Sequence, residues 1–136
     1  KLRIGSKVFF LGRKSGKNLA DFYRASDVLV LTSAFEGMPL VAIEAMSCGL
    51  PVVSTNVGEL QRVIKKSFSG EIVDTFLTID IAGAIGKVLD NPRIYSAEHC
   101  VNSVSEYKPE NVLQVLYRKI RDLDKKYKNA TLTTKQ

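Results

Sequence analysis

The feature that most constrains the fold is a strand, loop, helix, stop and second strand within residues 28–53. The first apolar run, 28–31, is rich in β-branched residues and is typical of a buried parallel strand. Residues 40–48 favour a helix, and Gly49 is a helix stop. A second apolar run starts at Val52. This order predicts two parallel strands joined by a helical crossover.

The start of this helix is a candidate anion site. Free backbone N–H groups and the positive end of the helix dipole point the same way at a helix N-terminus. Pro39 suits the first turn, because its missing N–H is not needed there. The available donors are the amides of Gly37, Met38, Leu40 and Val41.

Two carboxylates flank this helix start. Glu36 lies in the loop, and Glu44 lies four residues after Leu40 on the same helix face, about 6 Å further along the axis. A ligand with a phosphate at the helix tip and hydroxyls on both sides would meet both, and a sugar nucleotide has that layout. From the residues alone, a solvated helix-edge position for Glu44 remains an equal alternative.

The rest of the chain repeats the alternation of strand and helix. Strands are expected at 7–11, 28–32, 52–54 and 71–73. Helices are expected at 19–25, 40–48, 59–66, 78–89, 94–105 and from Pro109 to about Tyr127. This order predicts an α/β fold, a Rossmann-like parallel sheet with flanking helices, which binds ligands at the carboxyl ends of its strands.

Composition agrees with one globular domain or part of one: 136 residues, 45% hydrophobic and 25% charged. No stretch approaches the roughly 18 apolar residues of a membrane span, and no signal peptide is visible. Cys48 and Cys100 fit no disulfide pattern, and with His99 alone no metal site is supported. We therefore expect reduced thiols and a cytoplasmic location.

The net charge of +6 is concentrated at the C-terminal end, where residues 118–136 carry +5. An anionic membrane surface, a nucleic acid or water alone could face this charge. Nucleic acid is the less favoured partner, because Tyr117 and Tyr127 have the spacing of core or edge positions rather than of a stacking platform. The apolar residues of the last helix recur at three and four and predict a buried face: Leu113, Leu116, Tyr117, Ile120 and Leu123.

The segment from Glu36 to Glu44, with seven residues between the glutamates, resembles the donor site of retaining GT-B glycosyltransferases. The family type is family 4, also described as glycosyl transferases group 1, and the match is to its C-terminal, donor-binding domain. The resemblance runs from about Lys7 to about Tyr127. Further elements that match are Phe9–Gly12, Ala25–Ser33, Ala45–Val53 and Asn56–Gly58.

This resemblance implies a hexosyltransferase-like enzyme that transfers a sugar from a nucleotide-sugar to a glycan or lipid acceptor with retention. It implies neither a cofactor nor a bound metal. Glu36 would be the catalytic residue that contacts the sugar and orients the donor, and Glu44 would bind the ribose. The other donor-binding residues would be Gly37 and Met38 for the sugar, Leu40 and Val41 for the diphosphate, and Gly12 and Arg13 for the base.

The chain also departs from the family pattern. The family has two strand-helix units before this part, carrying an Arg and a Lys for the diphosphate, and Lys1, Arg3 and Lys7 lie on a different element. Glu59 and Arg62 stand where the family has a second glycine and a glutamate. We therefore expect a partial donor domain that is inactive alone and needs a missing N-terminal acceptor domain.

Residues 1–128 are expected to form this partial domain, and residues 129–136 a flexible basic tail. The outer strand 7–11 would either pair directly with 28–31 or leave a sheet edge that pairs with another copy in a dimer. Two other functions stay open. The first is a non-catalytic nucleotide-sugar-binding subunit of a split transferase, and the second is a basic module that binds nucleic acid or contacts a membrane peripherally.

Overall fold

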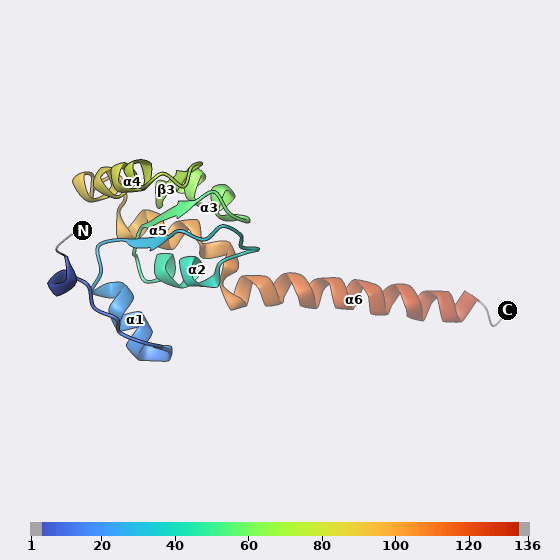
Figure 1. Cartoon of the computed structure of the whole chain (residues 1–136). Coiled ribbons are helices and arrows are strands. Elements are labelled where there is room, and N and C mark those ends of the chain that lie inside the picture. The colour runs from blue at the N-terminus through green and yellow to red at the C-terminus, as the bar shows by residue number, and fades with distance from the viewer. Residues whose placement is uncertain (1–3, 134–136) are drawn as a thin grey trace.

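The chain forms a three-stranded parallel sheet with helices on both faces (Figure 1). The structure is a computed structural model; it describes residues 4–133, without the side chains of residues 65–67, 126 and 128–133. The strands are β1 (Leu29–Leu31), β2 (Val52–Thr55) and β3 (Gly70–Val73), in the order β1-β2-β3. The Rossmann-like α/β arrangement predicted from the sequence is confirmed.

Helices cover both faces of the sheet, with α2 and α3 on one face and α4 on the other (Figure 1). Val52 packs in a cluster with residues of α1, α2, α3 and α5, whereas Val53 packs on the other face with Val88 of α4. The helix bounds are α1 (Gly16–Arg24), α2 (Leu40–Ser47), α3 (Leu60–Ser67), α4 (Thr78–Asp90), α5 (Ala97–Ser103) and α6 (Pro109–Thr133). Two 3-10 turns add η1 (Gly5–Lys7) and η2 (Ser105–Tyr107).

Helix α2 starts and stops where the sequence predicts. Pro39 is its N-cap, and Gly49 follows its end with a φ of +85°. Glycine is needed at 49 for a second reason, since a Cβ there would lie 2.8 Å from Cβ of Ala97. Glycine at position 49 therefore ends α2 and also allows the start of α5 to pack closely against the backbone there.

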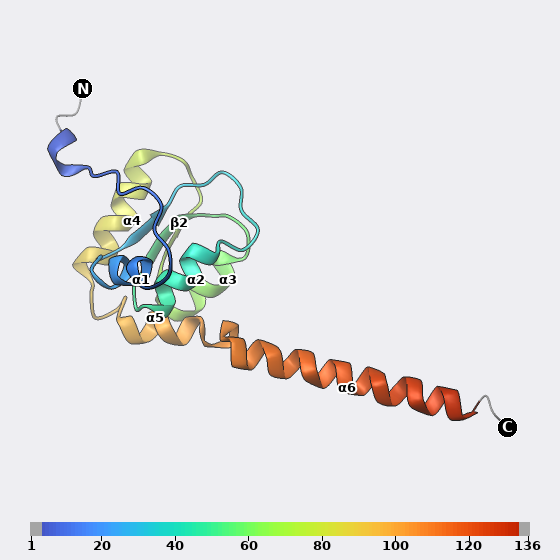
Figure 2. The same cartoon turned by 90° about the horizontal axis from the view of Figure 1, so that it is seen from below.

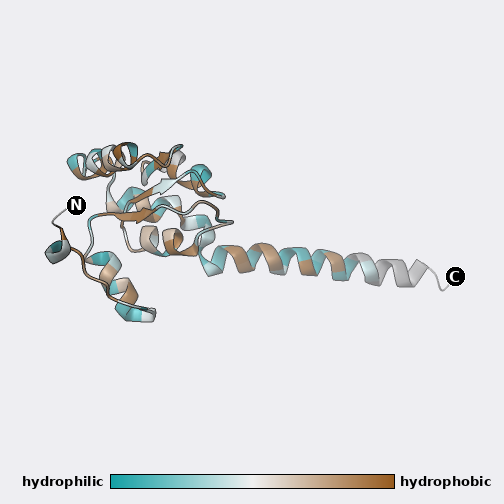
Figure 3. Cartoon of the chain, in the orientation of Figure 1, coloured by the Kyte–Doolittle hydropathy of each residue, from teal (hydrophilic) through white to brown (hydrophobic). Residues whose placement is uncertain are grey.

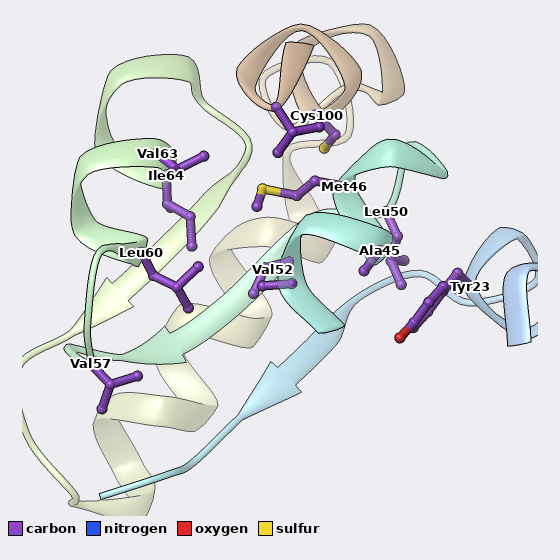
Figure 4. Packing of buried hydrophobic residues seen from close by; sticks show 12 residues of the cluster. Tyr23, Ala45, Met46, Leu50, Val52, Val57, Leu60, Val63, Ile64 and Cys100 are labelled. Carbon is purple, nitrogen blue, oxygen red and sulfur yellow. The ribbon is translucent and has the colours of Figure 1, made fainter. Parts of the chain in front are cut away.

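The larger core lies between the sheet and α2, α3 and α5 (Figure 4). Met46 is its largest fully buried side chain and lies among Val52, Ile64 and Cys100 in the close view. Burial of such side chains contributes about 2 kcal/mol each. Helix α2 is thus fixed through its inner face, which leaves its first turn at the carboxyl edge of the sheet.

The strand predicted at 7–11 is wrong. Residues 8–15 have no regular secondary structure, and the side chain of Phe10 is 97% exposed. A strand needs a paired neighbour, and within residues 4–133 the sheet ends at β1. Direct pairing of 7–11 with the 28–31 strand is therefore not formed, and dimerisation through the β1 edge stays a prediction.

The buried face predicted for the last helix is also wrong. α6 projects away from the sheet and its covering helices (Figures 1 and 2). The five residues of the predicted face lie between 45% exposed at Leu113 and 60% exposed at Tyr117. Apolar and polar turns alternate along the part of α6 that is coloured in Figure 3, but no surface in the described residues covers it.

Helix α6 continues to Thr133, six residues beyond the predicted end near Tyr127. Residues 134–136 lie outside the described residues, so the division at residue 128 stays a prediction. Within the described chain, no helix combines the length and the apolar content that crossing a membrane requires.

The buried thiol of Cys100 predicts a loss of stability at alkaline pH. Burial raises its pKa from 9.0 to about 11. The unfolded thiol therefore ionises at lower pH than the folded one, so its stabilising effect is full below pH 9 and disappears as the pH rises to about 11. We expect a loss of roughly 2 kcal/mol of unfolding free energy from this group.

Urea unfolding at pH 8.5 and pH 11 measures this loss. Burial also raises the pKa of Tyr23, Tyr95 and Tyr107, so these tyrosines also lower the free energy of unfolding as the pH rises. The Cys100→Ala variant keeps their contribution and should lose less stability than the wild-type chain over this interval. An equal loss in both chains would contradict a role for Cys100.

Candidate functional site

The loop after β1 is held by the end of β2. Thr55, the last residue of β2, donates its hydroxyl to the carbonyl oxygen of Ser33 at 2.6 Å. The Ser33 hydroxyl in turn donates to Oε1 of Glu36 at 3.0 Å. Glu36 is half-buried, and this chain of hydrogen bonds fixes its carboxylate at the carboxyl edge of the sheet.

The next loop residue, Gly37, is fixed by the turn after β2. The amide of Glu59 donates to the carbonyl oxygen of Gly37 at 3.1 Å. Gly58 has a φ of +52°, and a Cβ on it would lie 1.6 Å from that carbonyl oxygen. The turn therefore requires glycine. Glu59, where the sequence departs from the family pattern, contributes its backbone to holding Gly37.

The first turn of α2 presents unused backbone donors. Ala42 donates to the carbonyl oxygen of Pro39 at 3.0 Å, and no side chain caps this end. By helix geometry the amides of Leu40 and Val41 have no intrahelical acceptor. The first turn carries no acidic residue. This end can therefore accept an anion.

Glu44 lies on the exposed side of α2, one turn further along. Its Oε2 accepts a hydrogen bond from the hydroxyl of Tyr23 at 3.4 Å. Both residues line a groove of about 340 Å³ between α1 and α2, together with Leu19, Ile43 and Cys48. Burial raises the pKa of Tyr23, and the charge and hydrogen bond of Glu44 raise it further.

Three further predicted site residues are Met38, which lies in the loop with Glu36, and Gly12 and Arg13, which lie before α1. Met38 is half-buried between Gly37 and Pro39. Gly12, with a φ of +64°, and Arg13 lie in the exposed segment before α1. Among the described contacts, none joins Gly12 or Arg13 to Glu36 or Glu44.

Four residues of this arrangement were not predicted as site residues. Ser33 and Gly58 lie in segments that match the family pattern, whereas Thr55 and Tyr23 were not singled out. The only signal available is topological, because parallel strands place their following loops at one edge. The sequence shows no sign that Thr55 holds Ser33, since the two are 22 positions apart.

The chain is similar to known glycosyltransferases in sequence and in fold. The chain is 35% identical over 119 residues to a D-inositol 3-phosphate glycosyltransferase from Rhodococcus opacus (strain B4), covering 83% of this chain and 27% of that protein. It is 36% identical over 124 residues to the enzyme of that name from Corynebacterium urealyticum, covering 90% and 29%. The chain thus spans under a third of the length of these relatives.

A solved structure, the sucrose-phosphate synthase of Thermosynechococcus elongatus, superimposes with a TM-score of 0.74 at 30% identity. The match covers 88% of this chain and 32% of that one. Residues 1–110 match the family described as Glycosyl transferases group 1. On this match, the strand order and the Glu36–Glu44 loop and helix, the chain belongs to the group 1 glycosyl transferases, with a GT-B type of fold.

Proposed function

We propose that this chain is the donor-binding part of a retaining glycosyltransferase, which transfers a sugar from a nucleotide-sugar to a glycan or lipid acceptor. The observation that carries the proposal is the start of α2, where unused amides lie between two carboxylates on the carboxyl edge of the sheet. An enzyme of this kind would serve polysaccharide biosynthesis. The acceptor site would come from a domain that the chain does not span.

The first part of the proposal concerns the departing diphosphate. Negative charge develops on this group as the bond to the sugar breaks. The amides of Leu40 and Val41, with the helix dipole, stabilise that charge more than they stabilise the bound donor, which lowers the barrier. Gly37 and Met38 offer their amides to the sugar on the loop side.

The two carboxylates bind the two ends of the donor. Glu36, held by Ser33, accepts hydrogen bonds from sugar hydroxyls and orients the sugar for reaction. Glu44 accepts hydrogen bonds from the ribose on the groove side. Gly12 and Arg13 contact the base, mainly through their backbone. The pair does not act as the acid and nucleophile of a glycosidase, because Glu44 binds the nucleoside rather than the reacting carbon.

Protection of a thiol tests this proposal on the native chain. Cys48 lines the groove beside Glu44 and is partly exposed, whereas Cys100 is fully buried. At pH 8 a thiol reagent should therefore modify Cys48 and leave Cys100 unmodified until the chain unfolds. Millimolar UDP or GDP should slow the modification of Cys48 severalfold.

Inorganic pyrophosphate is the matched control for this experiment. It carries the anion for the helix start but no nucleoside for the groove, so it should leave the rate at Cys48 unchanged. An unchanged rate with both nucleotides would count against the nucleoside lying in this groove.

A further inference from the structure

Tyr23 combines a ring that belongs to the core with a hydroxyl that reaches the candidate donor site. It lies in the last turn of α1 and is 8% exposed. Its ring lies near Ala45 and Leu50 at the edge of the large cluster (Figure 4). Its hydroxyl lies at the end of this buried ring and bonds Oε2 of the exposed Glu44.

We propose that Tyr23 is a positioning residue that holds the Glu44 carboxylate ready for the ribose hydroxyls of the donor. This inference rests on the proposed role of Glu44. A carboxylate has about four acceptor positions, so one bond from Tyr23 leaves the others available to a ligand. An exposed glutamate samples several rotamers, and fixing one of them before binding lowers the entropic cost of binding.

The surroundings favour this role. Among the described side chains, no lysine or arginine forms an ion pair with Glu44, so the Tyr23 hydroxyl is the contact that orients it. Because burial and the Glu44 charge both raise the pKa of Tyr23, the hydroxyl stays protonated and remains a donor at neutral pH. The buried ring makes it a fixed donor rather than a mobile one.

The opposite face of the sheet provides a matched comparison. There Tyr95, also buried, donates its hydroxyl to Oε1 of Glu71. That carboxylate is in addition paired with Nζ of Lys87 at 2.9 Å. This second tyrosine–glutamate contact joins the connection between α4 and α5 to β3, away from the loops at the carboxyl edge, so it has a structural role without a ligand.

The test is a set of affinities for UDP and GDP, and for dUDP and dGDP, measured by calorimetry. Tyr23→Phe keeps the ring and removes the hydroxyl. We expect it to weaken binding of the ribonucleotide about three- to tenfold and to reduce the preference over the deoxyribonucleotide. The double variant Tyr23→Phe/Glu44→Gln should bind like Glu44→Gln alone, because the two residues act as a unit. Tyr95→Phe should leave both affinities unchanged.

Two results would overturn the inference while the proposed function stands. One is an unchanged affinity in Tyr23→Phe, and the other is a double variant whose loss of affinity equals the product of the two single losses. No nucleotide binding by the wild-type chain would overturn both. Should Tyr23→Phe fail to fold, the phenol of Tyr23 can be titrated by NMR with ¹³C at Cζ in the wild type and in Glu44→Gln. A lower Tyr23 pKa in Glu44→Gln supports the contact, and an unchanged pKa overturns it.

Discussion

Replacing Gly58 with alanine is expected to lower the free energy of unfolding by about 3 kcal/mol and to weaken binding of the nucleotide-sugar by about 10- to 100-fold. Two effects combine. A φ of +52° is unfavourable for an L-residue, and the new Cβ would lie 1.6 Å from the carbonyl oxygen of Gly37 and 2.8 Å from that of Glu36. The atoms that the new Cβ would meet belong to the backbone, so they can move only if the whole loop moves. The hydrogen bond from the Glu59 amide to the Gly37 carbonyl oxygen would then break, and Glu36 would shift.

Gly83→Ala is the matched control for this change. Gly83 lies inside α4, and a Cβ there would meet nothing within 4 Å. We expect this variant to gain up to about 1 kcal/mol of stability and to bind the nucleotide-sugar as the wild type does. Thermal unfolding and calorimetry measure both quantities. A Gly58→Ala chain with wild-type stability and binding would show that the contact between the two loops is not tight.

Alanine substitutions at Glu36 and at Glu44 are expected to weaken the binding of different parts of the donor, the sugar and the nucleoside respectively. Glu44→Ala should weaken binding of a nucleoside diphosphate and of its nucleotide-sugar alike, by about 10- to 100-fold, because both carry the ribose. Glu36→Ala should weaken only the nucleotide-sugar, by a similar factor, since the free diphosphate has no sugar for it to bind. Calorimetry with UDP, GDP and their glucose and mannose derivatives measures the four affinities.

Glu110→Ala serves as the control for both substitutions. Glu110 is exposed in the first turn of α6, away from the loops at the carboxyl edge, and should leave every affinity unchanged. If Glu36→Ala weakened the free diphosphate as much as the nucleotide-sugar, Glu36 would act on the loop rather than on the sugar. If neither substitution changed any affinity, the proposed donor site would be wrong.

The sequence predicts those elements whose signals are local. The β-branched run before the loop, Pro39 at the start of α2 and Gly49 at its end are sufficient to place the strand, helix and strand of the central unit. The helix over 78–89 was likewise found to within one residue, as α4. In each case the stabilising partners lie within the chain, so local preference and packing agree.

The errors occur at segments that find no packing partner among the described residues. Residues 7–11 have strand-forming composition, but within the described residues they pair with no strand. α6 has an apolar face by periodicity, and nothing described covers it. Periodicity identifies a face that can be buried, but it does not supply the surface that buries it.

Only part of the candidate site could be predicted from the sequence, because only part of it depends on local spacing. The positions of Glu36 and Glu44 around the start of α2 follow from spacing along the chain. The supports of these carboxylates, Ser33 with Thr55 and Tyr23 with Glu44, depend on contacts between segments that no local pattern links. Because such contacts form only on folding, the sequence alone could not predict them.

The central claim is that the first turn of α2 binds the diphosphate of a nucleotide-sugar. The most direct measurement is an NMR titration of the ¹⁵N-labelled chain with UDP, GDP and their sugars, following individual backbone amides. The account predicts saturable shifts of the Leu40 and Val41 amides, weakened in Glu44→Ala, with the Gly83 amide of α4 unmoved. Leu40 and Val41 amides that stay unchanged at millimolar concentrations of every ligand would contradict it.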